Sequence, residues 1–503
     1  MGTLESLPLF LPELTLAATL LALVAADLLT NRQPLGRRSE VTATLALVGG
    51  AAALVLTIGL PAGVRGQAAG LVPTFLFDGM VALDAFAIFF KVLIGLSLLA
   101  AVAMSLGSEE LRDNSSPGEY YAILVGATLG MFLMASATNL LMAYLALEFV
   151  SLASYVLTGY LKRDRRSSEA ALKYLIYGGV ASGAMIYGMS WVYGLTGAMD
   201  YPGIAAGLAA LDPASQGALA IALLLVLTGF GYKIAAVPFH MWAPDVYTGA
   251  PLPITTFLAV GSKAAGFALL LRFFHFGVTA EGPGAVVDAA GVPLLLGVVC
   301  GVTMTFGNLA ALSQQNVKRL LAYSSISHAG YGLLGVVVFS DAGVEAVLFY
   351  LAVYYLMNLG AFWIALLVVN TSGREDLDAF RGLAWRGGAA PAVFMAIFLF
   401  SLAGLPPLAG FVGKFKVFSA GIEGGAYALV LIGALNSVIS LYYYARIVKR
   451  MFLDEPHHDD PLWRVPAMEL GAPATLAALT VLLGIGFEWL SKQAGMASRI
   501  FTG

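Results

Sequence analysis

The sequence has 503 residues, of which 59% are hydrophobic and only 11% charged, and its mean hydropathy is +0.85. Such a chain has too few polar residues to form the surface of a soluble globular protein. It is therefore predicted to be an all-α membrane protein with many spans. The single cysteine, Cys300, excludes a disulfide framework, a cysteine-ligated zinc site and an iron–sulfur cluster, and the net charge of −3 indicates no particular partner.

Apolar segments of about 20 residues, long enough to cross a bilayer, recur along the whole chain. The first of them lacks the basic start of a signal peptide and is predicted to be a retained helix. Counting the segments that are long enough to cross the membrane gives about fourteen transmembrane helices. They are placed at 8–29, 41–62, 82–106, 119–136, 138–160, 169–195, 217–242, 252–275, 288–310, 318–340, 343–369, 391–418, 424–448 and 470–490.

The basic residues alternate between the connections. Every second connection, beginning with the first one, "NRQPLGRRSE", lies on the same side of the membrane. If that side is cytoplasmic, the cytoplasmic connections hold most of the Lys and Arg residues of the loops. The opposite set holds only Arg65, Arg272, Lys492 and Arg499. Because basic loops stay on the cytoplasmic side, both termini are predicted to lie outside.

Six lysines lie within the predicted spans: Lys91, Lys173, Lys233, Lys263, Lys414 and Lys416. A lysine at the centre of a span costs about 2.5–3.5 kcal/mol, so each must be paired, neutral or hydrated. Lys173 lies near the inner end of its span, and Lys416 lies just beyond Lys414. For both, a lysine that reaches the interface or solvent is as good an interpretation as a functional lysine buried in the membrane. Lys91 is expected to pair with Asp84, seven residues earlier on the same helix face.

Five ionisable residues from five predicted helices fall near the middle of the bilayer. For any one of them alone, a structural ion pair is as good an interpretation as a functional role. A row of five at one depth favours a path for protons, because each group gains and loses a proton when its surroundings change. The five are Glu148, Lys233, Lys263, His328 and Lys414.

Prolines interrupt two of the predicted spans. Pro238 lies in the seventh, and Pro406 and Pro407 lie in the twelfth, where each removes a backbone hydrogen bond and breaks the helix. Two broken helices that lie five spans apart are typical of transporters with inverted five-helix repeats. The predicted divisions are three helices in 1–112, helices 4–8 in 113–278, helices 9–13 in 279–452, and a loop with the last helix in 453–503.

Several stretches of the chain resemble the antiporter-like membrane subunits of respiratory complex I. The resemblance covers nearly the whole chain, and its most specific parts are "PFHMWAPDVYTGAP" and "GLPPLAGFVGKF". It implies fourteen helices with the seventh and twelfth broken, proton translocation in a bacterial inner membrane, and no cofactor or metal bound by this chain. NAD, FMN, iron–sulfur clusters and quinone would belong to partner subunits.

The same resemblance assigns roles to individual residues. Glu148 matches the glutamate of the fifth helix, and His328 fits the tenth-helix position that bridges the eighth and twelfth. The lysines of the sixth, seventh, eighth and twelfth helices are matched by Lys173, Lys233, Lys263 and Lys414. The resemblance thus implies that Lys173 is more than an interfacial lysine.

Two sister types of subunit differ from this chain. The M type has a glutamate in place of Lys414, and the L type adds a long lateral helix, whereas only "SKQAGMASRIFTG" follows the last predicted span here. Both differences favour the N type. The implied partners are a neighbouring antiporter-like subunit, small K-, J- and A-type subunits and the lipid bilayer, with no nucleic acid.

The predicted mechanism begins with Glu148, which stabilises protonated Lys233; loss of that support makes the buried lysine release its proton. The proton is expected to pass by way of Ser262 to Lys263, through His328 to Lys414, and out. Two alternatives remain: a subunit of a multi-subunit sodium/proton antiporter, and a structural spacer whose buried charges only fix helix packing. No dinucleotide-binding or phosphate-binding motif supports a soluble enzyme.

Overall fold

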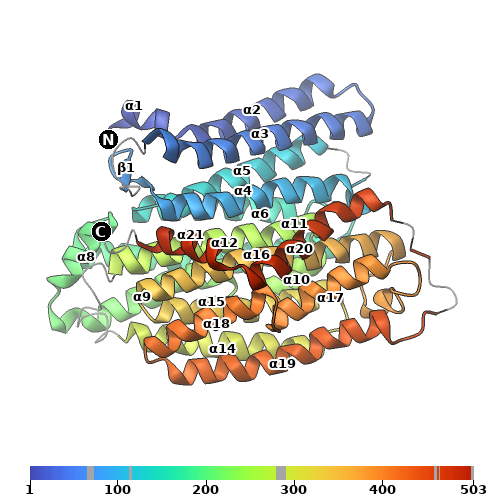
Figure 1. Cartoon of the computed structure of the whole chain (residues 1–503). Helices are drawn as coiled ribbons and strands as arrows, with labels where there is room; N and C mark the ends of the chain where they lie inside the picture. The colour runs from blue at the N-terminus through green and yellow to red at the C-terminus, as the bar shows by residue number, and fades with distance from the viewer. Residues whose placement is uncertain (65–72, 113–115, 279–290, 458–461, 464, 500–503) are drawn as a thin grey trace. The chain divides into compact units, whose positions relative to one another are not determined.

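The computed structural model describes residues 1–64, 73–112, 116–278, 291–457, 462–463 and 465–499 (Figure 1). Arg65 and the start of the predicted 288–310 span lie outside the described residues. The chain divides into two compact units. Unit 1 comprises Met1–Ile234, Gly249–Leu295 and Met496–Gly503, and unit 2 comprises Ala235–Thr248 and Leu296–Gly495.

The described part of the chain is helical apart from one short hairpin. Thirteen of its helices are long and apolar enough to cross a membrane, and Ala389–Ala403 is a shorter apolar helix. These helices coincide with the predicted spans to within a few residues at most ends. The prediction of a helical membrane protein with many spans is therefore confirmed.

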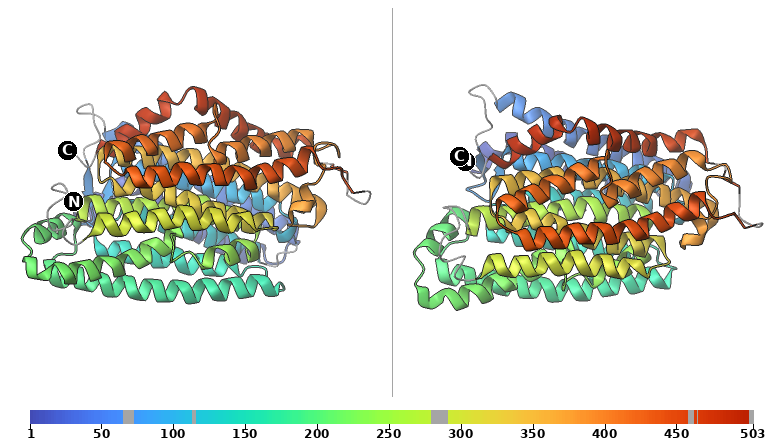
Figure 2. Two further views of the ribbon diagram at one scale, coloured as in Figure 1. Left: turned by 90° about the horizontal axis from the view of Figure 1, so that it is seen from below. Right: turned by 60° about the horizontal axis from the view of Figure 1, so that its bottom comes forward.

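Unit 1 contains the first six predicted spans, the seventh as far as Ile234, and the eighth. Its helices and strands are α1 (Thr3–Ser6), η1 (Leu7–Leu9), α2 (Leu11–Thr30), α3 (Leu35–Val64), β1 (Thr74–Leu76), β2 (Val81–Leu83), α4 (Ala85–Leu106), η2 (Glu109–Leu111), α5 (Pro117–Ser136), α6 (Leu140–Thr158), α7 (Arg165–Thr196), α8 (Tyr201–Ala209), η3 (Pro213–Ser215), α9 (Gln216–Ile234), α11 (Leu252–Phe257), η4 (Leu258–Ser262), α12 (Lys263–Arg272) and η5 (Phe273–Val278). The antiparallel β1–β2 hairpin pairs Thr74 with Leu83, and no predicted element anticipates it. The α7–α9 pair, in teal and green, is seen from two further directions in Figure 2.

Unit 2 contains the remaining spans. Its helices are α10 (Trp242–Gly249), α14 (Val292–Leu312), α15 (Val317–Val337), α16 (Asp341–Ser372), η6 (Leu377–Phe380), α17 (Ala389–Ala403), α18 (Ala409–Glu423), α19 (Tyr427–Phe452), η7 (Ala467–Leu470), α20 (Gly471–Ile485) and α21 (Glu488–Ser498). One end of α10, of α14 and of α21 belongs to unit 1. α16 is buried along most of its length and packs against α15, α17, α18 and α20. It is therefore the central helix of this unit.

α7 and α16 have matching features. Both have 32 residues, and a polar side chain caps the start of each, Asp164 in α7 and Ser340 in α16. Each ends at a glycine in the left-handed region, Gly197 with φ 71° and Gly373 with φ 67°, where a side chain would be strained. Matching features of this kind are expected if α7 and α16 are equivalent helices of the two predicted repeats.

The seventh span is interrupted at the predicted place. α9 ends at Ile234, Ala235 has a positive φ of 59°, and the peptide bond before Pro238 is cis. Within unit 2, the backbone N–H of Val237 donates to the Thr303 hydroxyl at 3.0 Å. A side-chain hydroxyl thus satisfies a backbone group that the break releases.

The twelfth span is interrupted in a similar way. α17 ends at Ala403, and Gly404 takes a φ of 89° before the cis bond between Pro406 and Pro407. The N–H of Gly410, at the start of α18, donates to the Ser401 hydroxyl at 3.0 Å. Both breaks therefore persist because hydroxyl groups replace the lost backbone partners.

Candidate functional site

Glu148 and Lys233 form the first part of the candidate site. Glu148 lies on α6, and Lys233 lies in the last turn of α9, directly before the break. The lysine side chain is buried, and its Nζ has no hydrogen-bond partner among the described residues; the same holds for the buried Oε1 of Glu148. Glu148 acts electrostatically on Lys233. The carboxylate therefore offsets part of the cost of burying the ammonium group.

Three tyrosines surround this pair. The rings of Tyr155 and Tyr174 lie 4.9 Å apart, and the Tyr232 hydroxyl donates to the backbone carbonyl of Tyr174 at 3.1 Å. A Cβ at Gly178 would lie only 1.8 Å from the Tyr155 hydroxyl oxygen, so a glycine is needed at this position. Glu148 acts electrostatically on both Tyr155 and Tyr232. The ion-binding groups thus lie among polar phenols.

Lys263 lies at the start of α12, where the preceding turn η4 is a π-helix. Single π-turns inside α-helices occur often at functional sites. The lysine is buried, and a Cβ at Gly266, one turn further, would lie 3.1 Å from the Cγ of Lys233. α12 therefore packs directly on the side chain of Lys233, and unit 1 brings together the helices of Glu148, Lys233 and Lys263.

In unit 2, His328 of α15 lies between two phenols. Its Nδ1 is 2.5 Å from the Tyr350 hydroxyl and its Nε2 is 3.2 Å from the Tyr444 hydroxyl. The Tyr444 hydroxyl also bonds to the hydroxyl of Ser324. A neutral imidazole donates through one nitrogen and accepts through the other, so this chain of groups is suited to passing a proton.

Lys414 of α18 is buried and bonds to the end of the preceding half-helix. Its Nζ donates to the carbonyl oxygen of Ala403 at 2.9 Å and lies 4.6 Å from the centre of the Tyr331 ring. A Cβ at Gly404 would lie 2.9 Å from the Cδ of Lys414. The last carbonyls of a helix carry partial negative charge, so the end of α17 stabilises the ammonium form.

Two of the six lysines in the predicted spans, Lys173 and Lys416, are less buried and are ion-paired. Lys173 pairs with Glu169, one turn earlier on α7, at 2.9 Å, and its side chain is 40% exposed. Lys416 of α18 pairs with Glu345 of α16 at 2.8 Å, and its side chain is 22% exposed. The structure places both lysines nearer the surface of their unit than the other four members of the set.

The predicted pair between Asp84 and Lys91 is wrong. Asp84 precedes α4 with an extended backbone and caps it by accepting from the N–H of Ala87, so it does not share a helix face with Lys91. Its carboxylate instead bonds twice to Arg272, at 2.8 and 2.9 Å. Lys91 pairs with Glu13 of α2 at 2.5 Å. Arg272, predicted to belong to the outer connections, is fully buried at the end of α12.

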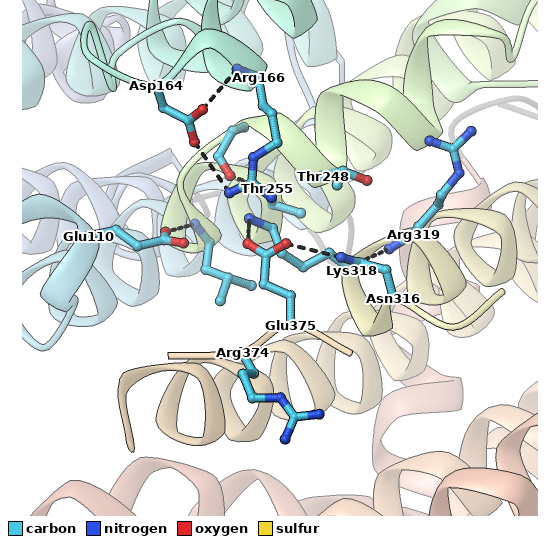
Figure 3. A network of polar contacts seen from close by, with 12 residues as sticks. Glu110, Asp164, Arg166, Thr248, Thr255, Asn316, Lys318, Arg319, Arg374 and Glu375 are labelled. Atoms are coloured by element: carbon cyan, nitrogen blue, oxygen red, sulfur yellow. Dashed lines mark hydrogen bonds and ion pairs between the residues drawn. The ribbon is translucent and has the colours of Figure 1, made fainter. Parts of the chain in front are cut away.

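A further set of polar contacts lies at helix ends (Figure 3). In unit 2, the two carboxylate oxygens of Glu375 accept from Lys318 at 3.1 Å and from the side chain of Asn316 at 3.0 Å. In unit 1, Glu110 accepts from the backbone N–H of Leu252 at 3.0 Å. These contacts tie the start of α15 to the segment after α16 and the start of α11 to η2, which is a structural role.

The tyrosines that surround the ionisable groups were not predicted as site residues. Tyr350 and Tyr354 lie in "VLFYLAVYYLMN", and Tyr444 lies in "SLYYYAR". All three are buried. A tyrosine within a predicted span indicates a polar neighbour, because a buried phenol needs a hydrogen-bond partner. Tyrosines are also common at membrane interfaces, so their presence in the sequence does not by itself indicate a site.

No group of three or more His, Cys, Asp or Glu side chains that could hold a metal ion occurs within the described ranges of the chain. The buried polar groups described above are instead mostly lysines, tyrosines and serines. Ammonium, phenol and alcohol groups are poor metal ligands but can all exchange protons. The donor set thus suits proton transfer.

Comparison with known families and proteins gives consistent results. Residues 137–440 match the family model described as "NADH:quinone oxidoreductase/Mrp antiporter, TM". The chain is 47% identical over 505 residues to NADH-quinone oxidoreductase subunit N of Anaeromyxobacter sp., with 95% of this chain and 94% of that protein covered.

Two solved structures are similar to this one. A chain of respiratory complex I from Thermus thermophilus matches with a TM-score of 0.77 and 33% identity, covering 95% of this chain and 98% of that chain. A chain of the Mrp complex from Dietzia sp. matches with a TM-score of 0.81 and covers 97% of this chain and 96% of that chain. Its 23% identity shows a shared fold alone.

Proposed function

The chain belongs to the NADH:quinone oxidoreductase/Mrp antiporter family of membrane subunits, and on that basis we propose that it translocates protons as the N-type subunit of NADH:quinone oxidoreductase. The observation that carries the proposal is the burial of Lys233, Lys263, His328 and Lys414 within helices, together with the partly buried Glu148. All of these except Lys414 lie in helices that are long and apolar enough to cross a membrane. Buried ionisable groups are costly in a membrane and mark ion pathways.

The proposed cycle starts at Glu148. While this carboxylate is charged, it stabilises protonated Lys233, whose Nζ has no other partner among the described residues. When Glu148 turns away or is neutralised, the buried ammonium loses this support and gives up its proton. Because α12 packs on Lys233, Lys263 is the next acceptor in unit 1.

In unit 2, the proton passes through His328 to Lys414 and leaves toward the outer face. His328 takes a proton on one nitrogen and releases one from the other, and its two phenol partners fix the orientation of the ring. Lys414 then holds the proton at the end of α17 until release. Lys173, paired with Glu169 near the inner end of α7, is proposed to supply protons to the first repeat.

The subunit carries out no redox chemistry in this proposal. NAD, FMN, iron–sulfur clusters and quinone are bound by partner subunits, and this chain binds no cofactor or metal. Its direct neighbours are another antiporter-like subunit and the small K-, J- and A-type subunits, in a bacterial inner membrane with both termini outside. The basic inner connections support this orientation.

The test is proton pumping by the assembled complex in inverted membrane vesicles. Lys233→Ala, Glu148→Ala and Lys414→Ala are expected to lower the number of protons moved per NADH oxidised. Lys449→Ala is the matched control, because that lysine lies at the surface end of α19 with 64% of its side chain exposed. A wild-type ratio in all three variants would support the structural-spacer alternative instead.

The sodium/proton antiporter alternative makes a different prediction. An antiporter moves sodium whenever a proton gradient exists, even when NADH oxidation is blocked. Vesicles energised by an imposed pH gradient, with no NADH present, therefore separate the two functions. Sodium uptake that depends on Lys233 under those conditions would favour the antiporter.

A further inference from the structure

The ion pair between Lys416 and Glu345 is a titratable cluster that the cycle above does not use. Lys416 follows Lys414 by two residues on α18, and its Nζ donates to Oε1 of Glu345 at 2.8 Å. The Ser491 hydroxyl of α21 donates to the same oxygen at 3.1 Å. The side chains of Lys416 and Glu345 are 22% and 32% exposed, so the pair is partly open to its surroundings.

The position of Glu345 along α16 sets the depth of this pair. Glu345 lies four residues and Tyr350 nine residues from Asp341, so Glu345 is about 7.5 Å nearer the Asp341 end than the tyrosine that bonds His328. The charge pattern predicts that the Asp341 end is at the outer face. Glu345 thus lies between the level of His328 and the outer surface.

The pair also lies close to Lys414. A Cβ at Gly413 would lie 3.1 Å from the ring of Tyr350, so α18 packs on α16 beside Lys414. Lys416 lies about one turn beyond Gly413 on α18, and its ammonium is 5.4 Å from the ring of Phe349, the residue before Tyr350 on α16. The same two helices therefore carry the buried lysine and the more exposed ion pair.

Glu345 of α16 has a positional counterpart in α7, which is Glu169. Glu169 and Glu345 are each the fifth residue of their helices, and the buried Tyr174 and Tyr350 are each the tenth. Glu169 pairs with a lysine of its own helix, whereas Glu345 takes its lysine from α18. In inverted repeats, equivalent residues face opposite sides of the membrane.

We propose that Glu345, paired with Lys416, is the group that releases protons to the outer face, as the counterpart of Glu169 and Lys173 at the inner face. This inference rests on the proposed function. The proton that leaves Lys414 adds to the Glu345 carboxylate, which becomes a neutral carboxyl and loosens its ion pair. The carboxyl O–H then breaks, the proton enters the outer solvent, and the carboxylate pairs again with Lys416.

The alternative is that the cluster only anchors α21. A Cβ at Gly495 would lie 3.3 Å from Oε2 of Glu345, so α21 packs against the carboxylate. Ser491→Ala removes the hydrogen bond to α21 but keeps the acid and the lysine. Glu345→Gln keeps the size of the side chain and its capacity to accept from Ser491, but removes the titratable group.

The experiment compares proton-to-NADH ratios in vesicles that contain equal amounts of assembled complex. Glu345→Gln and Lys416→Gln are expected to lower the ratio as much as Lys414→Ala does, while Glu345→Asp restores it. Glu423→Gln, at the exposed end of α18, is the control for loss of a carboxylate from the helix that carries Lys416. Should Glu345→Gln fail to assemble, Lys416→Gln still tests the pair.

Three results would overturn the inference. A wild-type ratio in Glu345→Gln, alongside a lowered ratio in Lys414→Ala, would reject the release role and leave the proposed function intact. A loss in Ser491→Ala as large as that in Glu345→Gln would identify the cluster as an anchor. A wild-type ratio in Lys414→Ala as well would reject both the inference and the proposed function.

Discussion

Gly404→Ala perturbs Lys414 without removing it. Gly404 has a φ of 89°, and an alanine there costs about 1–2 kcal/mol because its side chain disfavours the left-handed region. The new Cβ would also lie 2.9 Å from the Cδ of Lys414, so the lysine must move away. Loss of its bond to the Ala403 carbonyl costs a further ~1.5–3 kcal/mol, the range for a charged donor.

Gly373→Ala is the matched control. Gly373 also ends a helix with a positive φ, at 67°, but a Cβ there has no atom within 4 Å. Only the backbone cost of about 1–2 kcal/mol applies to it. The difference between the two variants is therefore the cost of moving Lys414, and ~1.5–3 kcal/mol corresponds to roughly a tenfold to hundredfold fall in the bonded population.

Inverted vesicles provide the assay for both variants. We expect Gly404→Ala to lower the number of protons moved per NADH oxidised, and Gly373→Ala to keep the wild-type number while its thermal midpoint falls slightly. Equal ratios in the two variants, at equal content of assembled subunit, would show that the bond between Lys414 and the end of α17 does not matter for pumping.

The other predictions concern buried polar contacts. Arg272→Met leaves the Asp84 carboxylate buried without its partner, which costs about 3–5 kcal/mol, and should reduce the amount of assembled subunit on native gels; adding Asp84→Asn should restore part of it, and no restoration would contradict the pairing. Ser401→Ala removes the acceptor of a buried N–H at the second break and should lower the thermal midpoint through a loss of about 1–3 kcal/mol, whereas an unchanged midpoint would show that another group satisfies it. Tyr350→Phe keeps the ring but removes the hydroxyl beside His328, so pumping should fall while assembly stays normal; unchanged pumping would remove Tyr350 from the path.

The spans and both helix breaks could be predicted from the sequence because they depend on local properties. A run of about 20 apolar residues specifies a membrane helix, and a proline removes a backbone donor wherever it occurs. The depth of Glu148, Lys263 and His328 in the membrane was predicted by counting residues within each span, and it stays a prediction. These inferences needed no knowledge of which helices are neighbours.

The partners of the buried charges could not be predicted in the same way. Asp84 was assigned to Lys91 because both fall on one predicted helix, but one residue decides whether Asp84 lies on the helix or caps it. Its true partner, Arg272, is 188 residues away in the sequence. A pairing over that separation depends on helix packing, to which hydropathy and spacing give no access.

The two broken helices hold their lysines differently, and this difference gives the proposed cycle a direction. Lys414 bonds to a carbonyl at the end of α17, a fixed group whose partial charge cannot be switched off. Lys233 has no such bond among the described residues and depends on Glu148, a side chain that can turn or be neutralised. A lysine supported by a mobile charge changes its proton affinity when that charge moves, whereas one supported by backbone keeps it. The control step therefore belongs to Glu148 and Lys233, and Lys414 serves as the store from which the proton leaves.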